Sequence, residues 1–76
     1  MTTDEIKAFK NIEKHIPKNQ VCIIWAYNKL KNQLCLTRDI SQEYCLYLLD
    51  KNKLSKIKQS KNPEILEKML DELSQK

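Results

Sequence analysis

The 76-residue sequence contains no glycine, and this absence constrains its fold more than any other feature. Glycine serves tight hairpin turns, phosphate-binding loops and many helix C-caps, because it adopts positive φ angles without steric cost. Nucleotide-binding loops of the Walker or dinucleotide type are therefore excluded. Compact all-β folds are disfavoured for the same reason. The sequence predicts helices joined by loops that contain Asn and Pro.

The two ends of the chain carry the clearest helix signals. Acidic residues open the first apolar stripe, which recurs at helical spacing until Pro17 stops it. Near the C-terminus, Asn62 is a favourable N-cap and Pro63 a favourable first helical residue, and one apolar stripe follows them. These patterns predict helices over residues 3–16 and 63–74.

Seven consecutive apolar residues, Val21 to Tyr27, allow two interpretations. As part of a helix over residues 20–36, Ile23, Ala26 and Tyr27 form a core-facing stripe with the leucines that follow, and Val21, Ile24 and Trp25 fall on the opposite side. As part of a β-hairpin, they alternate between two faces and return across the loop NKLKNQ, which agrees with their high β-propensity. We favour the helix, because a six-residue hairpin loop without glycine is poor turn chemistry and residues 29–34 are mostly good helix formers.

The segment YCLYLL, Tyr44–Leu49, is apolar around the whole helical wheel, which indicates an element buried on more than one side. It predicts a helix over residues 40–50. The polar stretch DKNK interrupts the pattern, so only a weaker helical extension to residue 59 is expected. Taken together, the sequence predicts an all-α fold, a small bundle of three to four helices in one domain that covers residues 1–76.

The sequence has three cysteines, Cys22, Cys35 and Cys45. Their number is odd, and the polar N-terminal stretch does not resemble a signal segment. Gaps of 12 and 9 residues separate them, so they lack the Cys-x-x-Cys spacing of zinc sites, and His15 does not complete one. We therefore expect the three cysteines to be small buried hydrophobic residues that form no disulfide and bind no metal. We also expect the protein to be cytoplasmic and to bind no cofactor. No membrane insertion is expected, because the apolar runs are too short to cross a bilayer.

The formal net charge of +4 is unevenly spread, and residues 51–61 hold five lysines without an acid. Such a stretch is a modest electrostatic footprint for an anionic partner. An alternative hypothesis is therefore a helix-turn-helix-like regulator that binds nucleic acid. Its contacting residues would be Lys51, Lys53, Lys56, Lys58, Lys61 and Arg38. A solvated lysine face is the competing explanation, since arginine, the usual reader of guanine, occurs once.

Catalysis is not expected, because the chain has only one histidine. The sequence also shows no pattern that would bring together a nucleophile, a base and an acid, or two carboxylates. No small-molecule substrate is evident either. In the helical interpretation, part of the Val21–Tyr27 run stays outside the core and forms a contiguous apolar patch, which usually marks an interface. We favour a non-enzymatic regulator, inhibitor or adaptor that binds a protein partner or forms a homodimer. The predicted contact residues are Val21, Ile24, Trp25 and Tyr44.

Overall fold

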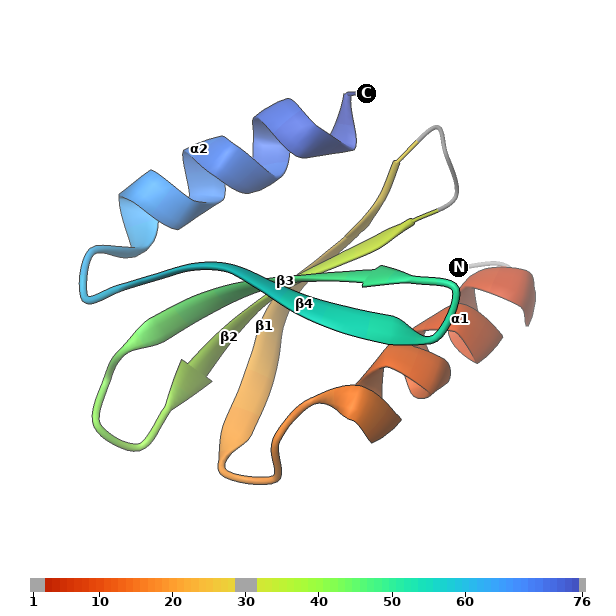
Figure 1. The fold of residues 1–76 in the computed structure, drawn as a ribbon, viewed down its shortest axis with the longest axis horizontal. Coiled ribbons are helices and arrows are strands. Elements are labelled where there is room, and N and C mark those ends of the chain that lie inside the picture. The colour runs from red at the N-terminus through yellow and green to blue at the C-terminus, as the bar shows by residue number, and fades with distance from the viewer. Residues whose placement is uncertain (1–2, 29–31, 76) are drawn as a thin grey trace.

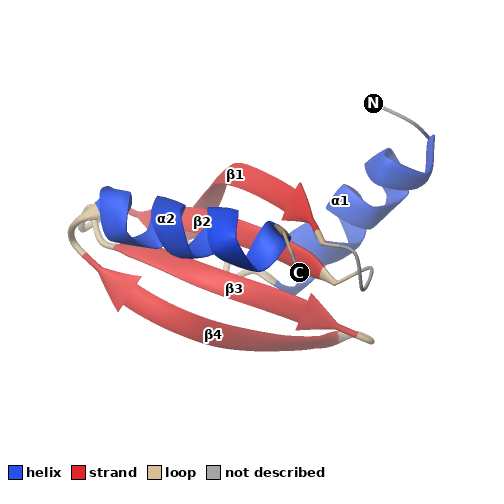
Figure 2. Cartoon of the chain, turned by 90° about the horizontal axis from the view of Figure 1, so that it is seen from above, coloured by secondary structure: helices blue, strands red, loops and turns tan. Residues whose placement is uncertain are grey.

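The computed structural model describes residues 3–28 and 32–75 and shows an antiparallel sheet with one helix on each face (Figure 1). Its elements are, in chain order, α1 (Thr3–His15), β1 (Gln20–Tyr27), β2 (Gln33–Asp39), β3 (Tyr44–Asp50), β4 (Lys53–Ser60) and α2 (Pro63–Ser74). The four strands pair in the order in which they follow one another, so the sheet is a meander with β1 and β4 as its edges (Figure 2).

Alternate residues of the central strands form the face that α2 covers. Leu34 and Leu36 of β2 and Leu46 of β3 are fully buried there, against Leu66 and Leu70 of the helix. Because side chains alternate between the two faces of a strand, the residues between them point the other way. These leucines of β2 and β3 therefore pack against α2.

The opposite face is covered by α1, which runs beneath the sheet in Figure 1. Ile12 of this helix and Ile16, directly after its end, pack against Cys35 of β2 and Leu49 of β3, and all four side chains are buried. The two apolar clusters, one under each helix, make β2 a strand that is buried on both sides. Both helices are therefore needed to close the core.

The two terminal helices lie where the sequence predicts them. The Asn62 side chain accepts a hydrogen bond from the backbone N–H of Glu64 at 3.1 Å, and Pro63 begins the helix. This satisfies one of the backbone donors that every helix leaves unpaired at its start. The local capping chemistry was therefore a sufficient signal for α2.

The prediction of an all-α bundle is wrong, because residues 20–27 and 33–60 supply the sheet and its turns instead of two further helices. The hairpin interpretation is the correct one for β1 and β2, although residues 29–31 of its loop lie outside the described part. A strand covered on both faces carries apolar residues at every position. Such a run imitates a helix that is apolar around its whole circumference, which is the error made for Tyr44–Leu49.

Hairpins form here without glycine because other residues adopt positive φ angles. Asp50 pairs with Lys53, and between them Lys51 and Asn52 have φ angles of 48° and 68°. A two-residue type I′ turn needs positive φ at both central positions, so this hairpin has the required backbone. Gln42, in the turn between β2 and β3, has a φ angle of 65°. Asn tolerates this region well, whereas Lys and Gln occupy it at a steric cost.

We expect Lys51→Gly to stabilise the protein by about 0.5 kcal/mol, because the steric cost of a positive φ angle that glycine removes exceeds the backbone entropy that glycine loses on folding. Lys53→Gly is the matched control: this neighbouring lysine lies in β4 at an ordinary φ angle, so its replacement should destabilise by about 0.5–1 kcal/mol. Urea unfolding of the two variants measures both changes. A loss of stability in Lys51→Gly equal to that in Lys53→Gly would contradict the type I′ turn.

Candidate functional site

The outer side of β1 is the most unusual feature of the surface. β1 pairs with β2 along one side, and within the described segments no strand pairs with its other side. Its eight residues include no charge and no proline, whereas edge strands usually carry such residues to prevent association with other chains. One protective device is present, a bulge that inserts Ile23 between two residues paired with β2. Apart from this bulge, the outer side of β1 offers its backbone to a further strand.

Apolar side chains accompany this open backbone. Val21 is 67% exposed, Ile23 46% and Tyr27 44%. We call these three residues the β1 edge patch. Ile40, in the turn between β2 and β3, is 92% exposed and lines one hollow together with Val21. Tyr27 lies at the other end of the strand, beside Trp25, with the ring centroids 5.7 Å apart. Exposed apolar residues therefore occur along the length of β1.

Two open hollows flank the start of β1. The first lies between α1 and β1, where Phe9 and Val21 provide apolar walls and Glu13 and Lys18 provide one charge of each sign. The second lies between β1 and the β2–β3 turn. Val21 lines both hollows, so the exposed end of the strand stands between two places where a side chain of a bound molecule can lodge.

The turn beside the second hollow is held by Asp39. Its carboxylate accepts hydrogen bonds from the Ser41 hydroxyl at 2.7 Å, from the Ser41 backbone N–H at 2.9 Å and from the Glu43 backbone N–H at 3.0 Å. The hydroxyl of Ser41, followed by the backbone N–H of Glu43, lowers the pKa of the Asp39 carboxyl from its ordinary value. These bonds fix the loop that presents Ile40 to solvent.

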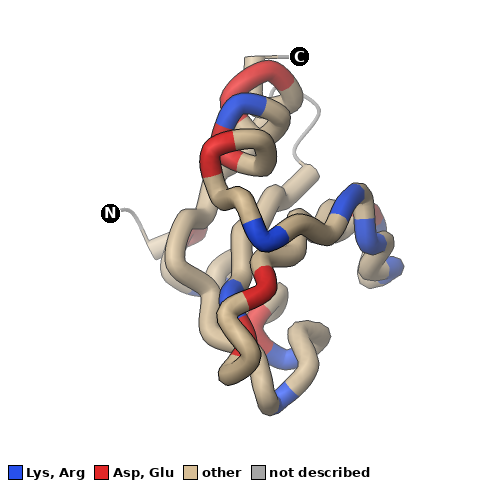
Figure 3. Tube along the Cα trace, turned by 90° about the vertical axis from the view of Figure 1, so that its left-hand side faces the viewer, with Lys and Arg blue, Asp and Glu red and all other residues tan. Residues whose placement is uncertain are grey.

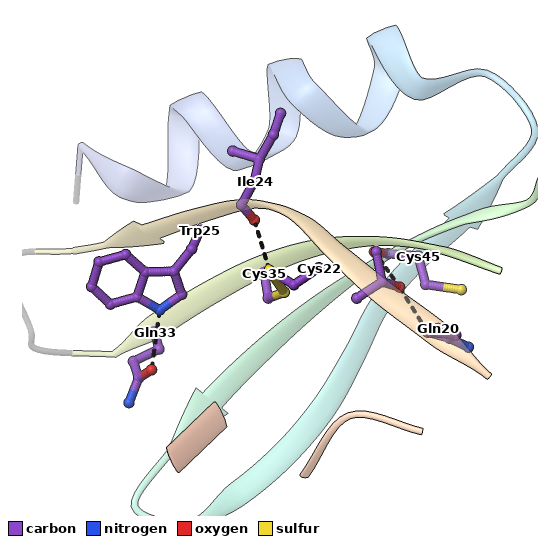
Figure 4. The surroundings of a disulfide bond; sticks show 8 residues. Gln20, Cys22, Ile24, Trp25, Gln33, Cys35 and Cys45 are labelled. Carbon is purple, nitrogen blue, oxygen red and sulfur yellow. Dashed lines mark hydrogen bonds between the residues drawn. A yellow bond between two sulfur atoms is a disulfide. The ribbon is translucent and has the colours of Figure 1, made fainter. Parts of the chain in front are cut away.

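The structure separates the residues predicted to form one patch around Trp25. Figure 4 shows Ile24 directed toward α2 and Trp25 on the other side of the sheet. The Trp25 indole packs edge-to-face on Phe9, with the ring centroids 6.1 Å apart, and its Nε1–H donates to Gln33 Oε1 at 3.1 Å. Tyr44 is half-buried against the cluster under α2. Val21 is the predicted contact residue that lies fully at the surface.

Sequence reasoning missed the exposed partners of Val21, which are Ile23, Tyr27 and Ile40. A period of two from Val21 reaches Ile23, Trp25 and Tyr27, but Trp25 packs on Phe9 and the bulge at Ile23 interrupts the alternation. The strand period therefore indicates these exposed residues only in part. The helical period selected Ile24 and Trp25 instead. Ile40 has no periodic signal at all, because it belongs to a turn.

The lysines of the nucleic-acid hypothesis lie along the other edge of the sheet. All five are exposed on β4 and its flanks. Figure 3 shows the Lys and Arg positions of the chain as separate blue segments along the trace. The five lysines do not share one face: Lys58 pairs with Leu46 and Lys56 with Tyr47, two successive residues of β3. Arg38 lies two strands away on β2.

The helix-turn-helix expected from the predicted helices over residues 20–36 and 40–50 is wrong, because the structure has the strands β1, β2 and β3 there. Lysines on an edge strand also have a simpler explanation, since they discourage pairing with other chains. Nucleic-acid binding itself stays a prediction.

The cysteines depart from the sequence prediction. Cys22 of β1 and Cys35 of β2 form a disulfide, with their Cα atoms 6.2 Å apart, inside the usual range for such bonds (Figure 4). Cys45 is free and buried, as expected for a small hydrophobe. The prediction that all three are unpaired is therefore wrong. The cytoplasmic location was inferred from unpaired cysteines and stays a prediction without that support.

The described residues were also compared with the requirements of a metal site and of a membrane-spanning helix. Among residues 3–28 and 32–75, no three His, Cys, Asp or Glu side chains are grouped so that they could hold a metal ion. No helix in the same ranges is long and apolar enough to cross a membrane. No family model matches the chain, and no curated protein or solved structure matches it.

We expect reduction of the Cys22–Cys35 bond to lower the free energy of unfolding by about 2–3 kcal/mol. The bond joins residues 13 positions apart and so restricts the number of conformations open to the unfolded chain. Urea unfolding with and without a reductant measures the difference. Cys45→Ala should show the same difference, since this cysteine takes no part in the bond. Intact mass after alkylation of unreduced, unfolded protein should show one modified cysteine, and three would refute the disulfide.

The Asp39 turn should make stability depend on acid pH. A carboxyl whose pKa is lower in the folded state adds stability above its unfolded pKa of about 4, and this stability is lost as the pH falls through the folded pKa. Asp39→Asn keeps an acceptor oxygen but not the charge, so its urea midpoint should fall less steeply on acidification than that of the wild type. Asp71→Asn, on α2, serves as the control. Equal slopes for Asp39→Asn and wild type would contradict the assignment.

Proposed function

We propose that this protein is a non-enzymatic binding module that takes an extended segment of a protein partner as an added strand along β1. The observation that carries the proposal is the contrast between the uncharged, apolar, one-sided strand β1 and its lysine-rich counterpart β4. Both are edges of the same sheet, so the same backbone physics applies to both. The side chains protect β4 and leave β1 available.

Strand addition uses two kinds of contact, and β1 supports both. Main-chain hydrogen bonds along the edge contribute affinity, and pockets for alternate side chains contribute specificity. The hollows on either side of Val21 supply such pockets. Each contains one cation and one acid, Lys18 with Glu13 and Arg38 with Asp39, beside apolar walls. A partner segment with apolar or aromatic side chains and no strong net charge fits this surface best.

Rigid presentation of the edge favours binding, because less conformational freedom is lost when a partner docks. The Cys22–Cys35 bond ties β1 to the buried strand β2, and Trp25 anchors the same strand to α1 through Phe9. These interactions act from inside the sheet, so they hold β1 in place without covering its outer side.

Selection of displayed random peptides on the immobilised protein tests the proposal. We expect enrichment of uncharged segments in which β-branched or aromatic residues alternate. Synthesised as fluorescent peptides, they should bind Ile23→Lys at least about tenfold more weakly than the wild type, since a charge on the edge disfavours a further apolar strand.

The matched control for this experiment is Ile57→Lys. Both isoleucines are the inserted residues of edge-strand bulges, and they are 46% and 38% exposed. The control should therefore change charge and exposure in the same way while leaving peptide binding intact. If no segment is enriched, or if the enriched peptides lose affinity equally for both variants, strand addition at β1 is wrong.

A further inference from the structure

We infer that the occupant of the β1 edge in the free protein is β1 of a second copy, which gives a symmetric dimer with one sheet running through both chains. This inference rests on the proposed function, because it uses the same strand edge, and it identifies the partner as this chain itself. Two antiparallel edge strands related by a twofold axis can satisfy each other's outward backbone groups. The dimer thereby covers the one sheet edge that lacks charged residues.

The distribution of charge favours this arrangement over others. Each copy carries a net charge of +4, which opposes association in general. The lysines of β4, however, lie at the edge opposite β1. In an eight-stranded sheet the two β4 strands would be seven spacings apart, about 34 Å at about 4.8 Å each. That exceeds the screening length of about 8 Å at physiological salt several times over, so the lysine edges hardly repel each other.

The same distribution disfavours an open fibre. A fibre needs β1 of one copy to pair with β4 of the next, which would place lysines along the junction. Lys56 and Lys58 flank the bulge at Ile57, which also bends β4 away from regular pairing. Pairing of β1 with β1 keeps lysines out of the junction and leaves two lysine-rich edges at the outside. The bulge at Ile23 of β1 is present in both arrangements, so the lysines decide between them. Association therefore closes at two copies.

The side chains around β1 are suited to a twofold contact. The β1 edge patch supplies exposed apolar surface from each copy, and this surface is removed from water when the patches meet. Charges next to the strand come as pairs of opposite sign, Glu13 with Lys18 in one hollow and Asp39 with Arg38 in the other. The edge is thus locally neutral although the chain as a whole is basic.

Sedimentation equilibrium of the purified protein tests the dimer, from micromolar to millimolar concentration. The wild type should approach twice the chain mass of 9.1 kDa as its concentration rises. Ile23→Lys should weaken the dimer by more than about tenfold, since the substitution occurs on both sides of the contact. Ile57→Lys should dimerise like the wild type. Val21→Lys, at the most exposed position of the patch, is the second disrupting variant if circular dichroism shows that Ile23→Lys unfolds.

Hydrogen exchange locates the contact. Amide protection in residues 20–27 should rise with protein concentration, whereas protection in residues 53–60 should not. A peptide that binds the β1 edge should also convert the dimer to monomer, because the two occupants exclude each other.

A wild type that stays at 9.1 kDa throughout overturns the dimer and leaves strand addition to be judged by the peptide selection. A dimer that Ile57→Lys disrupts and Ile23→Lys does not places the contact at β4 and overturns the inference.

Discussion

Burial of both faces of β2 is the constraint on which the rest of the structure depends. Leu34 and Leu36 are fully covered on one side and Cys35 on the other. A sheet whose two faces are both apolar needs a layer on each, and this chain has one helix for each face. The helices come from opposite ends of the sequence, so the core is complete only when both termini have docked (Figure 1).

This constraint also explains which elements the sequence could predict. The terminal helices are each covered on one side, so their apolar residues fall in a stripe, and local caps such as Asn62 mark where they begin. The central strands receive apolar residues at nearly every position because both faces are covered. Periodicity cannot separate such a short run from a buried helix. The decisive information is the presence of two helices to cover the sheet, which no local window contains.

Turn chemistry misled the sequence analysis in a second way. The absence of glycine was taken to disfavour hairpins, yet Lys51, Asn52 and Gln42 occupy the positive φ region themselves. The steric cost is of order 1 kcal/mol per residue, which strand pairing on both sides of a turn can offset. The Asp39 carboxylate adds three hydrogen bonds that hold the other hairpin turn. Side-chain hydrogen bonds and strand pairing thus stabilise turns in which glycine would otherwise be expected.

The residues of the candidate site also depend on whether Val21–Tyr27 is a helix or a strand. Val21 is exposed in either interpretation, but a helix groups it with Ile24 and Trp25. A strand groups it with Ile23, Trp25 and Tyr27, and of these Trp25 is packed on Phe9. An apolar run was therefore recognised in the sequence as the functional clue, and its exposed members were not.

The asymmetry between the two edges of the sheet is the point at which fold and function meet. Charged residues make up 32% of the chain, so an eight-residue strand would carry two or three of them at that frequency. β4, also eight residues long, carries three lysines, and β1 carries none. Each strand has a bulge with an isoleucine inserted, so backbone geometry does not account for the difference. Neither does burial, because Val21 and Ile23 are exposed. An edge that is apolar, exposed and held rigid from within is costly for a free monomer, and contact with another strand removes that cost.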